Sequence, residues 1–192
     1  DQGSINAAKK LISRGDITAI VGSFVSSSNN IAIIPTIESA QTPLFAGGSS
    51  ANIKYEESDY TYMCRLSDDL TGSTMATAAV DVLGMSKIAI IHGSDSFGAG
   101  LRDQVTQALK EQYDIEPVLD ITFNPGEVQY TPFLTQIMNE DVDGIIAIAH
   151  QNDAGVMMKQ AGEMGIDLPR LGSTSFCSEV AITGAGDAAD GW

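Results

Sequence analysis

Short apolar runs alternate along the chain with stretches of helical period, and loops rich in glycine and serine separate them. The apolar runs predict strands at residues 17–21, 43–46, 87–91, 118–123, 144–149 and 170–172. The periodic stretches predict helices at residues 4–15, 31–37, 68–83, 97–109, 131–138 and 156–164. Because strands and helices alternate, the sequence predicts an α/β protein with parallel sheets.

Two segments indicate how the predicted elements pack. Phe97, Leu101, Val105 and Leu109 recur at every fourth position, which lays an apolar stripe along one face of a helix. Residues 118–123 instead alternate polar and apolar side chains, as a strand with one wet face does. We therefore expect the helix to lie on a sheet, and the strand to lie near the edge of that sheet.

A charged loop divides the chain. Residues 50–60 combine turn-forming side chains with a run of charge at 54–59, which is typical of a break between structural units. We place the boundary near Ser67, so that residues 1–67 and 68–192 form two separate parts.

Charge and cysteine content exclude several classes of function. The chain has 10 Lys and Arg against 25 Asp and Glu, a net charge of −15 that disfavours nucleic acid and anionic membranes. No apolar run approaches the roughly 20 residues that cross a bilayer. Cys64 and Cys177 match neither a redox pair nor a metal framework, and we expect both to be small core residues. The chain opens at Asp1 without a Met or a leader, which is uninformative.

Parallel sheets bind ligands beyond the carboxyl ends of their strands. This rule selects five loops, at residues 22–28, 47–50, 92–97, 150–153 and 172–176. The first two are expected to offer unpaired backbone N–H groups near helix starts, which suit an anion such as a carboxylate. Ser26, Ser27 and Ser28 have helix capping as an equally good interpretation.

Other candidate residues also have structural explanations. Asp68 begins a predicted helix, where it either caps the helix or holds a ligand ammonium. His92 and His150 follow predicted strands, a position at which an isolated histidine is usually a satisfied polar residue. Phe97 belongs to the apolar stripe, but it also lies where a pocket wall is expected.

Enzymatic motifs are missing from the sequence. A serine hydrolase using Ser26 or Ser27 with His92 or His150 would be the alternative class, but there is no G-x-S-x-G elbow. The glycine loop at residues 93–100 matches neither the dinucleotide nor the P-loop pattern. No zinc spacing or EF-hand pattern is present, so we expect no cofactor and no metal.

The chain resembles a known family in the order and spacing of several short motifs. They are Asp1-Gln-Gly-Ser before an Ala-Ala-Lys-Lys helix, Ala19-Ile-Val-Gly22, Thr42-Pro-Leu-Phe45 with Gly47-Gly-Ser-Ser50, Cys64-Arg-Leu-Ser-Asp68, Lys87-Ile-Ala-Ile-Ile91, Ser96-Phe-Gly-Ala-Gly100, Lys159-Gln-Ala-Gly162 and Gly186-Asp-Ala-Ala-Asp-Gly191. Together they resemble the type I periplasmic solute-binding proteins, specifically the leucine/isoleucine/valine-binding family of ABC transporters and its extracellular receptor relatives.

The resemblance implies a fold, a mechanism and a location. It implies a fragment of a two-lobed protein with Rossmann-like three-layer αβα lobes, in which 1–67 is part of lobe 1 and 68–192 most of lobe 2. It implies that the protein captures an amino acid or amide-like solute by hinge closure, works with a membrane permease and catalyses no reaction. It also implies a periplasmic or extracellular location, where the protein could be anchored as a lipoprotein. A sensory ligand-binding domain is the alternative. Family members extend beyond both ends of this chain, so the fragment is expected to associate with another copy or to need those segments.

The resemblance also assigns site residues. The ligand carboxylate would be held by Ser26, Gly47 and Ser49, and its ammonium by Asp68. The second lobe would contribute Phe97, His150, Gln151 and Thr174. Phe97 stands where the family often has Tyr, and Thr174 stands near a position that often holds an acid. With His150 added, these departures leave the preferred side chain open and include polar amino acids.

Overall fold

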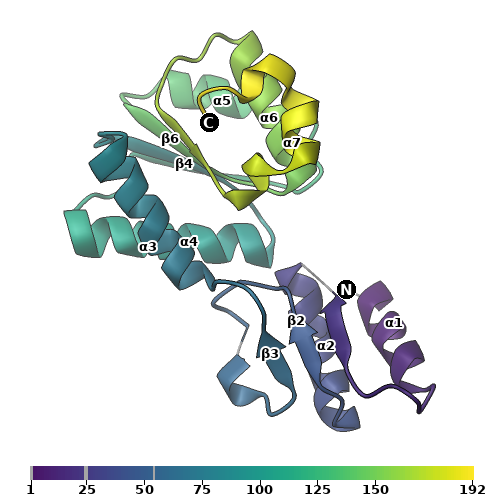
Figure 1. Ribbon diagram of the computed structural model, residues 1–192. Helices are drawn as coiled ribbons and strands as arrows, with labels where there is room; N and C mark the ends of the chain where they lie inside the picture. The colour runs from purple at the N-terminus through teal and green to yellow at the C-terminus, as the bar shows by residue number, and fades with distance from the viewer. Residues whose placement is uncertain (1, 24–25, 54) are drawn as a thin grey trace. The chain divides into compact units, whose positions relative to one another are not determined.

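The computed structural model describes residues 2–23, 26–53 and 55–192, and the chain divides into two compact units, residues 1–70 and 71–192. Figure 1 labels several elements of each unit. The division falls just beyond the predicted boundary at Ser67.

Unit 1 is a small parallel sheet covered by two helices. Its elements in chain order are α1 (Gln2–Ile12), β1 (Ile20–Ser23), α2 (Ser27–Ala40), β2 (Leu44–Ala46), the 3-10 turn η1 (Tyr55–Glu57) and β3 (Thr61–Met63). The strands pair in the order β1-β2-β3, all parallel. Ile20 and Leu44 turn to one face of the sheet and pack with Ala8, Ile33 and Ile37 of the helices. The apolar faces of the two helices and of the sheet therefore pack into one core.

The other face of the unit 1 sheet carries exposed apolar side chains, and we call it the bare face. Val21, Phe45 and Tyr62 alternate with the buried strand positions, and their exposed fractions are 73%, 37% and 48%. The rings of Phe45 and Tyr62 stack with centroids 5.5 Å apart. Parallel sheets are normally covered on both faces, because a βαβ crossover places helices there. This apolar face thus has the character of an interior surface.

Unit 2 is a three-layer α/β unit. It contains α3 (Asp68–Thr77, whose first residues belong to unit 1), a π-helical turn η2 (Ala78–Val82), β4 (Ile88–Gly93), α4 (Ser96–Tyr113), β5 (Leu119–Phe123), α5 (Thr131–Met138), β6 (Gly144–Ile148), α6 (Gln151–Glu163), β7 (Arg170–Gly172), η3 (Thr174–Cys177), α7 (Glu179–Ala185) and η4 (Gly186–Ala189). The four strands are parallel, in the order β5-β4-β6-β7. The predicted α/β class with parallel sheets is confirmed.

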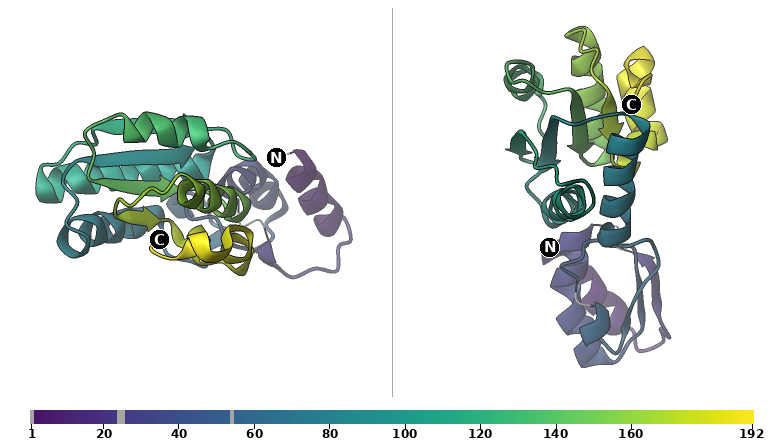
Figure 2. Two further views of the ribbon diagram at one scale, coloured as in Figure 1. Left: turned by 90° about the horizontal axis from the view of Figure 1, so that it is seen from above. Right: turned by 90° about the vertical axis from the view of Figure 1, so that its left-hand side faces the viewer.

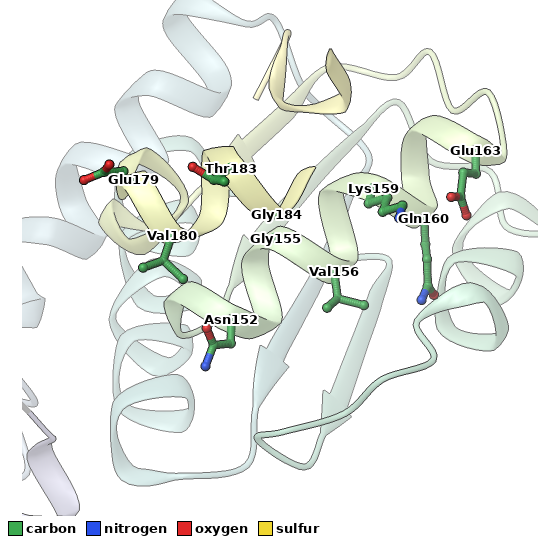
Figure 3. A pocket seen from close by; sticks show the side chains of 10 residues that line it. All are labelled: Asn152, Gly155, Val156, Lys159, Gln160, Glu163, Glu179, Val180, Thr183 and Gly184. Carbon is green, nitrogen blue, oxygen red and sulfur yellow. The ribbon is translucent and has the colours of Figure 1, made fainter. Parts of the chain in front are cut away.

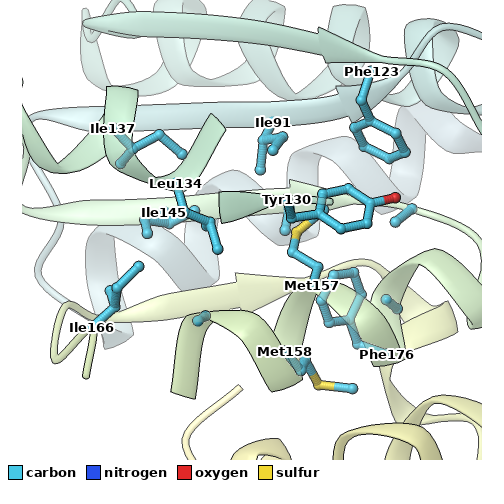
Figure 4. Packing of buried hydrophobic residues seen from close by; sticks show 14 of the residues in the cluster. Ile91, Phe123, Tyr130, Leu134, Ile137, Ile145, Met157, Met158, Ile166 and Phe176 are labelled. Carbon is cyan, nitrogen blue, oxygen red and sulfur yellow. The ribbon is translucent and has the colours of Figure 1, made fainter. Parts of the chain in front are cut away.

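Alternate residues of β4 point into two different cores. Ile88 and Ile90 pack with α3 and α4 on one face. Ala89 and Ile91 pack with α5, α6 and α7 on the other face, where Figure 4 shows Ile91 beside the aromatic and methionine side chains. Figure 2 shows this layering of unit 2 from two further directions. A strand buried on both faces reads as a continuous apolar run, as this segment does.

Several expectations from the sequence are confirmed and others are wrong. The stripe that begins with Phe97 is buried along α4, and β5 lies at an edge of its sheet. Cys64 and Cys177 are exposed free thiols, not core residues, because they lie on segments whose inward positions are taken by other side chains. Residues 50–60 are not a break: Tyr55 and Tyr60 pack against the unit 1 core, and the following strand β3 was not predicted.

Polar side chains of α6 hold the loop between β5 and α5. Asp153 is buried, and its Oδ1 accepts hydrogen bonds from Gly126 N–H at 2.8 Å and from the Tyr130 hydroxyl at 2.8 Å. Gln160 Oε1 accepts from the backbone N–H groups of Tyr130 and Thr131 at 2.6 and 3.0 Å. The backbone N–H groups of Gly126, Tyr130 and Thr131 are therefore satisfied by side chains of the neighbouring helix.

We predict that Tyr130→Phe destabilises the protein. The substitution keeps the buried ring but leaves Asp153 with one fewer donor, so urea unfolding is expected to show a loss of about 1–3 kcal/mol. Tyr113→Phe is the matched control, because the Tyr113 hydroxyl bonds Asp81 at the exposed surface. If both variants lose the same free energy of unfolding, burial of the Asp153 contact adds nothing to stability.

Candidate functional site

The predicted site residues of unit 1 lie around the start of α2 and the loop after β2. Ser26 is the N-cap residue of α2, but its side chain makes no capping hydrogen bond. The Ser27 hydroxyl accepts hydrogen bonds from Ser49 N–H at 3.3 Å and Ser50 N–H at 3.2 Å. The expectation that loop 47–50 offers unpaired N–H groups is therefore wrong for these two, because a buried serine already occupies them. Residues 24–25 of the loop 22–28 lie outside the described residues.

Asp68 joins this group of residues. Its backbone N–H donates to the Ser49 carbonyl at 2.8 Å, and the residue is only 1% exposed. Asp68 Oδ2 is buried without a hydrogen-bond partner among the described residues, and the Ser49 hydroxyl approaches the carboxyl without a well-aligned hydrogen bond. We call Ser26, Ser27, Gly47, Ser49 and Asp68 the serine–aspartate cluster.

Burial dominates the electrostatics of Asp68. Removal of the carboxyl from water raises its pKa to about 6, and the Ser49 hydroxyl and the Arg65 guanidinium oppose that rise. Arg65 is held next to the cluster by a 3.4 Å hydrogen bond to the Gly47 carbonyl. A buried carboxylate with a free oxygen is suited to a cationic donor, because an ammonium would supply the missing hydrogen bond and charge.

The predicted site residues of unit 2 lie on three neighbouring loops at the carboxyl end of its sheet. Phe97 and His150 are brought together, with ring centroids 5.2 Å apart. Gln151 is the exposed first residue of α6, and Thr174 is the exposed first residue of η3. The buried Ser173 ties the last two loops together, since its hydroxyl donates to the Ala149 carbonyl at 3.2 Å.

Sequence reasoning did not single out Asp95 or Ser173, and it considered Ser27 as a helix cap or a hydrolase nucleophile but not as a partner of the loop after β2. Asp95 Oδ2 bonds His150 Nε2 at 2.8 Å. The Ser27 hydroxyl accepts hydrogen bonds from N–H groups of the loop after β2, and Ser173 joins the loops after β6 and β7. An N-cap signal was available for Asp95, which lies three residues before Gly98. Nothing in the sequence pairs Ser27 or Ser173 with their partners.

His92 is a satisfied core residue. It lies within β4 and not in a loop, is 2% exposed, and its Nε2 lies 3.1 Å from Thr122 Oγ1 and 3.3 Å from Asp120 Oδ1. Its Nδ1 lies 2.8 Å from the Gly93 carbonyl. The structural interpretation of His92 therefore holds, and the hydrogen bonds described for the two histidines reach no serine.

An open groove lies elsewhere on unit 2. It encloses about 900 Å³ between α6 and α7, where Gly155 and Gly184 let the two helices approach closely (Figure 3). Its walls come from Val156, Lys159 and Val180 among others, and include none of the eight predicted site residues. Among the described residues, no three His, Cys, Asp or Glu side chains are grouped to hold a metal ion, and no helix is long and apolar enough to cross a membrane.

Comparison with known proteins identifies the family. The family model described as "Periplasmic binding protein" matches residues 1–192. The chain belongs to this family. It is 26% identical over 185 residues to an "Amino acid binding protein" of Pseudomonas aeruginosa, covering 95% of this chain and 49% of that protein. It is 25% identical over 190 residues to the "Leucine-specific-binding protein" of Salmonella typhimurium, covering 98% and 50%. The chain thus spans about half the length of these relatives.

Solved structures of this family share the fold. A leucine binding protein from Thermotoga maritima superposes with a TM-score of 0.87 at 20% identity, covering 96% of this chain and 52% of that one. A solute binding protein from R. palustris, solved with 4-hydroxybenzoate, also gives a TM-score of 0.87 at 16% identity, covering 96% and 50%. The periplasmic-binding-protein resemblance and fold predicted from the sequence are confirmed.

We predict that Asp68→Asn stabilises the ligand-free protein at neutral pH. The wild-type carboxyl has a folded-state pKa raised to about 6, so its ionisation opposes folding as the pH rises from about 4 through 6. The neutral amide avoids this cost, and we expect the free energy of unfolding to increase by on the order of 1–2 kcal/mol at pH 7.5. Thermal unfolding of both proteins at pH 4 and pH 7.5 measures the effect.

The gain should shrink strongly at pH 4, where the wild-type carboxyl is protonated in the folded protein and about half protonated in the unfolded chain. An equal gain at both pH values would attribute it to the shape of the side chain and not to its charge. Asp16→Asn serves as a control, because Asp16 is an exposed acid that bonds only Arg14 among the described contacts.

Proposed function

We propose that this protein is the solute-binding component of an ABC transporter, acting outside the cytoplasm and catalysing no reaction. Membership in the periplasmic binding protein family supports this proposal. The two units are assigned to part of lobe 1 and most of lobe 2, which would close on the ligand about a hinge. The closed form would then be recognised by a membrane permease.

The observation that carries the ligand class is the buried oxygen of Asp68. An unsatisfied carboxylate oxygen in a folded protein costs free energy unless a ligand completes its bonding. An α-ammonium would do so, and the Ser26 hydroxyl and the first N–H groups of α2 would receive the α-carboxylate. To reach Ser49 and Ser50 N–H, that carboxylate would have to replace the Ser27 hydroxyl. The proposed ligand is therefore a free amino acid.

An aromatic acid is the second candidate ligand. The relative from R. palustris was solved with 4-hydroxybenzoate, which has a carboxylate but no ammonium. In this chain Phe97 and His150 form a ring pair that could contact a flat ligand. Such a ligand would leave Asp68 Oδ2 without a partner, so the two classes differ in their need for this residue.

We predict that the full-length protein is stabilised in a thermal-shift screen by at least one free amino acid. A ligand that binds only the folded protein raises its melting temperature. Asp68→Asn should abolish the shift by an amino acid, because the ammonium loses its anionic partner, and affinity should fall at least about 30-fold. Asp69→Asn is the control, since Asp69 is the adjacent acid but is exposed.

The same variant separates the two ligand classes. If 4-hydroxybenzoate shifts the melting temperature and Asp68→Asn leaves that shift unchanged, the amino acid assignment is wrong and the aromatic acid is favoured. If no amino acid and no aromatic acid shifts it, the transport proposal loses its support.

We also propose that the 192-residue chain associates with another copy through the bare face of the unit 1 sheet. Exposed apolar surface of this kind is costly in water, and Val21, Phe45 and Tyr62 form a contiguous row across three paired strands. The proposal concerns this chain alone, since further segments of a longer protein would compete for the same face.

Light scattering on a size-exclusion column tests this association. We expect the 192-residue chain to show concentration-dependent growth above its monomer mass of 20.2 kDa. Phe45→Ser with Tyr62→Ser should restore the monomer, because it removes the stacked pair. Val128→Ser, an exposed apolar residue of unit 2, should change nothing. A monomer at every concentration would exclude the association.

A further inference from the structure

One carboxylate of unit 2 makes two contacts at once. Asp95 is the N-cap of α4, and its Oδ1 accepts a hydrogen bond from Gly98 N–H at 3.1 Å. Its Oδ2 lies 2.8 Å from Nε2 of His150, the N-cap residue of α6. Because β4 and β6 are adjacent parallel strands, their following loops lie side by side and the contact spans them. Asp95 therefore joins two loops that are 55 residues apart in sequence.

The imidazole of His150 is held from two sides. Asp95 bonds its Nε2, and the Phe97 ring lies against it with centroids 5.2 Å apart at an interplanar angle of 35°. Phe97 is 7% exposed, whereas the side chains of Asp95 and His150 are 20% and 36% exposed. The three residues form a fixed group whose Asp95 and His150 side chains remain partly exposed to solvent. We call Asp95, Phe97 and His150 the imidazole clasp.

We propose that Asp95 is a positioning residue that sets ligand preference: it fixes His150 so that unit 2 selects an amino acid whose side chain carries a hydrogen-bond acceptor. This inference rests on the proposed binding function and names the ligand class within it. With Nε2 committed to Asp95, a protonated imidazole has Nδ1–H as its other donor. A carboxylate or amide oxygen would accept that bond, while an aliphatic side chain would bury the donor without a partner.

The surroundings of His150 favour the protonated imidazole. The hydrogen bond to Asp95 raises the pKa of His150, burial opposes that rise, and the charges of Asp95 and Asp153 add to it. Burial would raise the pKa of Asp95, but the bonds from His150 and Gly98 N–H hold it below its usual value. Ser173 and Thr174, on the loop after β7, are neutral. A raised histidine pKa means that the charged clasp is complete below about pH 6.5 and is lost as the pH rises through the folded-state pKa.

The first test needs no ligand. The chain has two histidines, so a proton NMR titration with His150→Gln for assignment resolves the imidazole of His150. We expect a pKa above the ordinary value in the wild type, and a clearly lower pKa in Asp95→Asn, in which Asn still caps α4. Asp114→Asn is the matched control, because Asp114 pairs with Lys110 at the far end of the same helix. An unchanged titration in Asp95→Asn overturns the clasp.

The second test measures preference in the full-length protein with L-glutamine, L-glutamate and L-leucine as probes. We expect the wild type at pH 6 to bind glutamine or glutamate at least about 10-fold more tightly than leucine, a difference of one well-formed hydrogen bond. Asp95→Asn should remove most of that preference while changing leucine affinity less than about threefold. The wild-type preference should also shrink between pH 6 and pH 8.5.

The outcomes separate this inference from the proposed function. Equal losses of affinity for all three probes in Asp95→Asn would mean that Asp95 only supports the fold, and would overturn the positioning role. A wild type that prefers leucine at both pH values would overturn the selected ligand class while leaving the transport proposal intact. A normal His150 titration shift without binding of any amino acid would count against the proposed function and not against the clasp itself.

Discussion

The adjacent pairing of β4 and β6 determines where the candidate residues of unit 2 lie. Ile88 to His92 pair in parallel register with Gly144 to Ile148, so both strands end at the same level of the sheet. Alternate side chains of β4 enter cores on opposite faces, so a slip in register would exchange alanine and isoleucine positions and disturb the packing of both cores. Because α4 and α6 begin directly after these strands, Asp95 and His150 meet. Weakening of the strand pairing would therefore disturb the clasp before it touched any ligand contact.

Two buried carboxylates in this chain differ in how their oxygens are hydrogen-bonded. Asp153 has its Oδ1 bonded by a backbone N–H and a tyrosine hydroxyl, so its burial is compensated and it stabilises a loop. Asp68 is equally buried, but one oxygen has no partner among the described residues and its pKa is raised to about 6. The first arrangement is typical of a carboxylate that stabilises the fold. The second is typical of a binding residue, since the free energy lost in the empty state is recovered when a cationic group arrives.

Local patterns were enough to predict most of the elements, because burial imposes a period on each of them, but they predicted neither β3 nor α7. The stripe beginning at Phe97 and the alternation that places β5 at an edge depend only on neighbouring residues. Cys64 and Cys177 were misplaced because residue type gives an average burial, whereas their actual exposure depends on which neighbours occupy the core. Strand β3 was missed because three residues show too little period, and its pairing with β2 is a tertiary effect.

The candidate site was less predictable than the fold, since its contacts join residues far apart in sequence. The hydroxyl of Ser27 reaches Ser49 and Ser50 across more than 20 residues, and Asp95 reaches His150 across 55. The fold needs only apolar side chains of suitable size, which is consistent with a TM-score of 0.87 at 16–20% identity. Specificity instead depends on a few polar atoms at loop ends, where one substitution changes a donor into an acceptor. The contacts of His150 therefore bear more directly on the ligand of this protein than its overall similarity to leucine-binding relatives does.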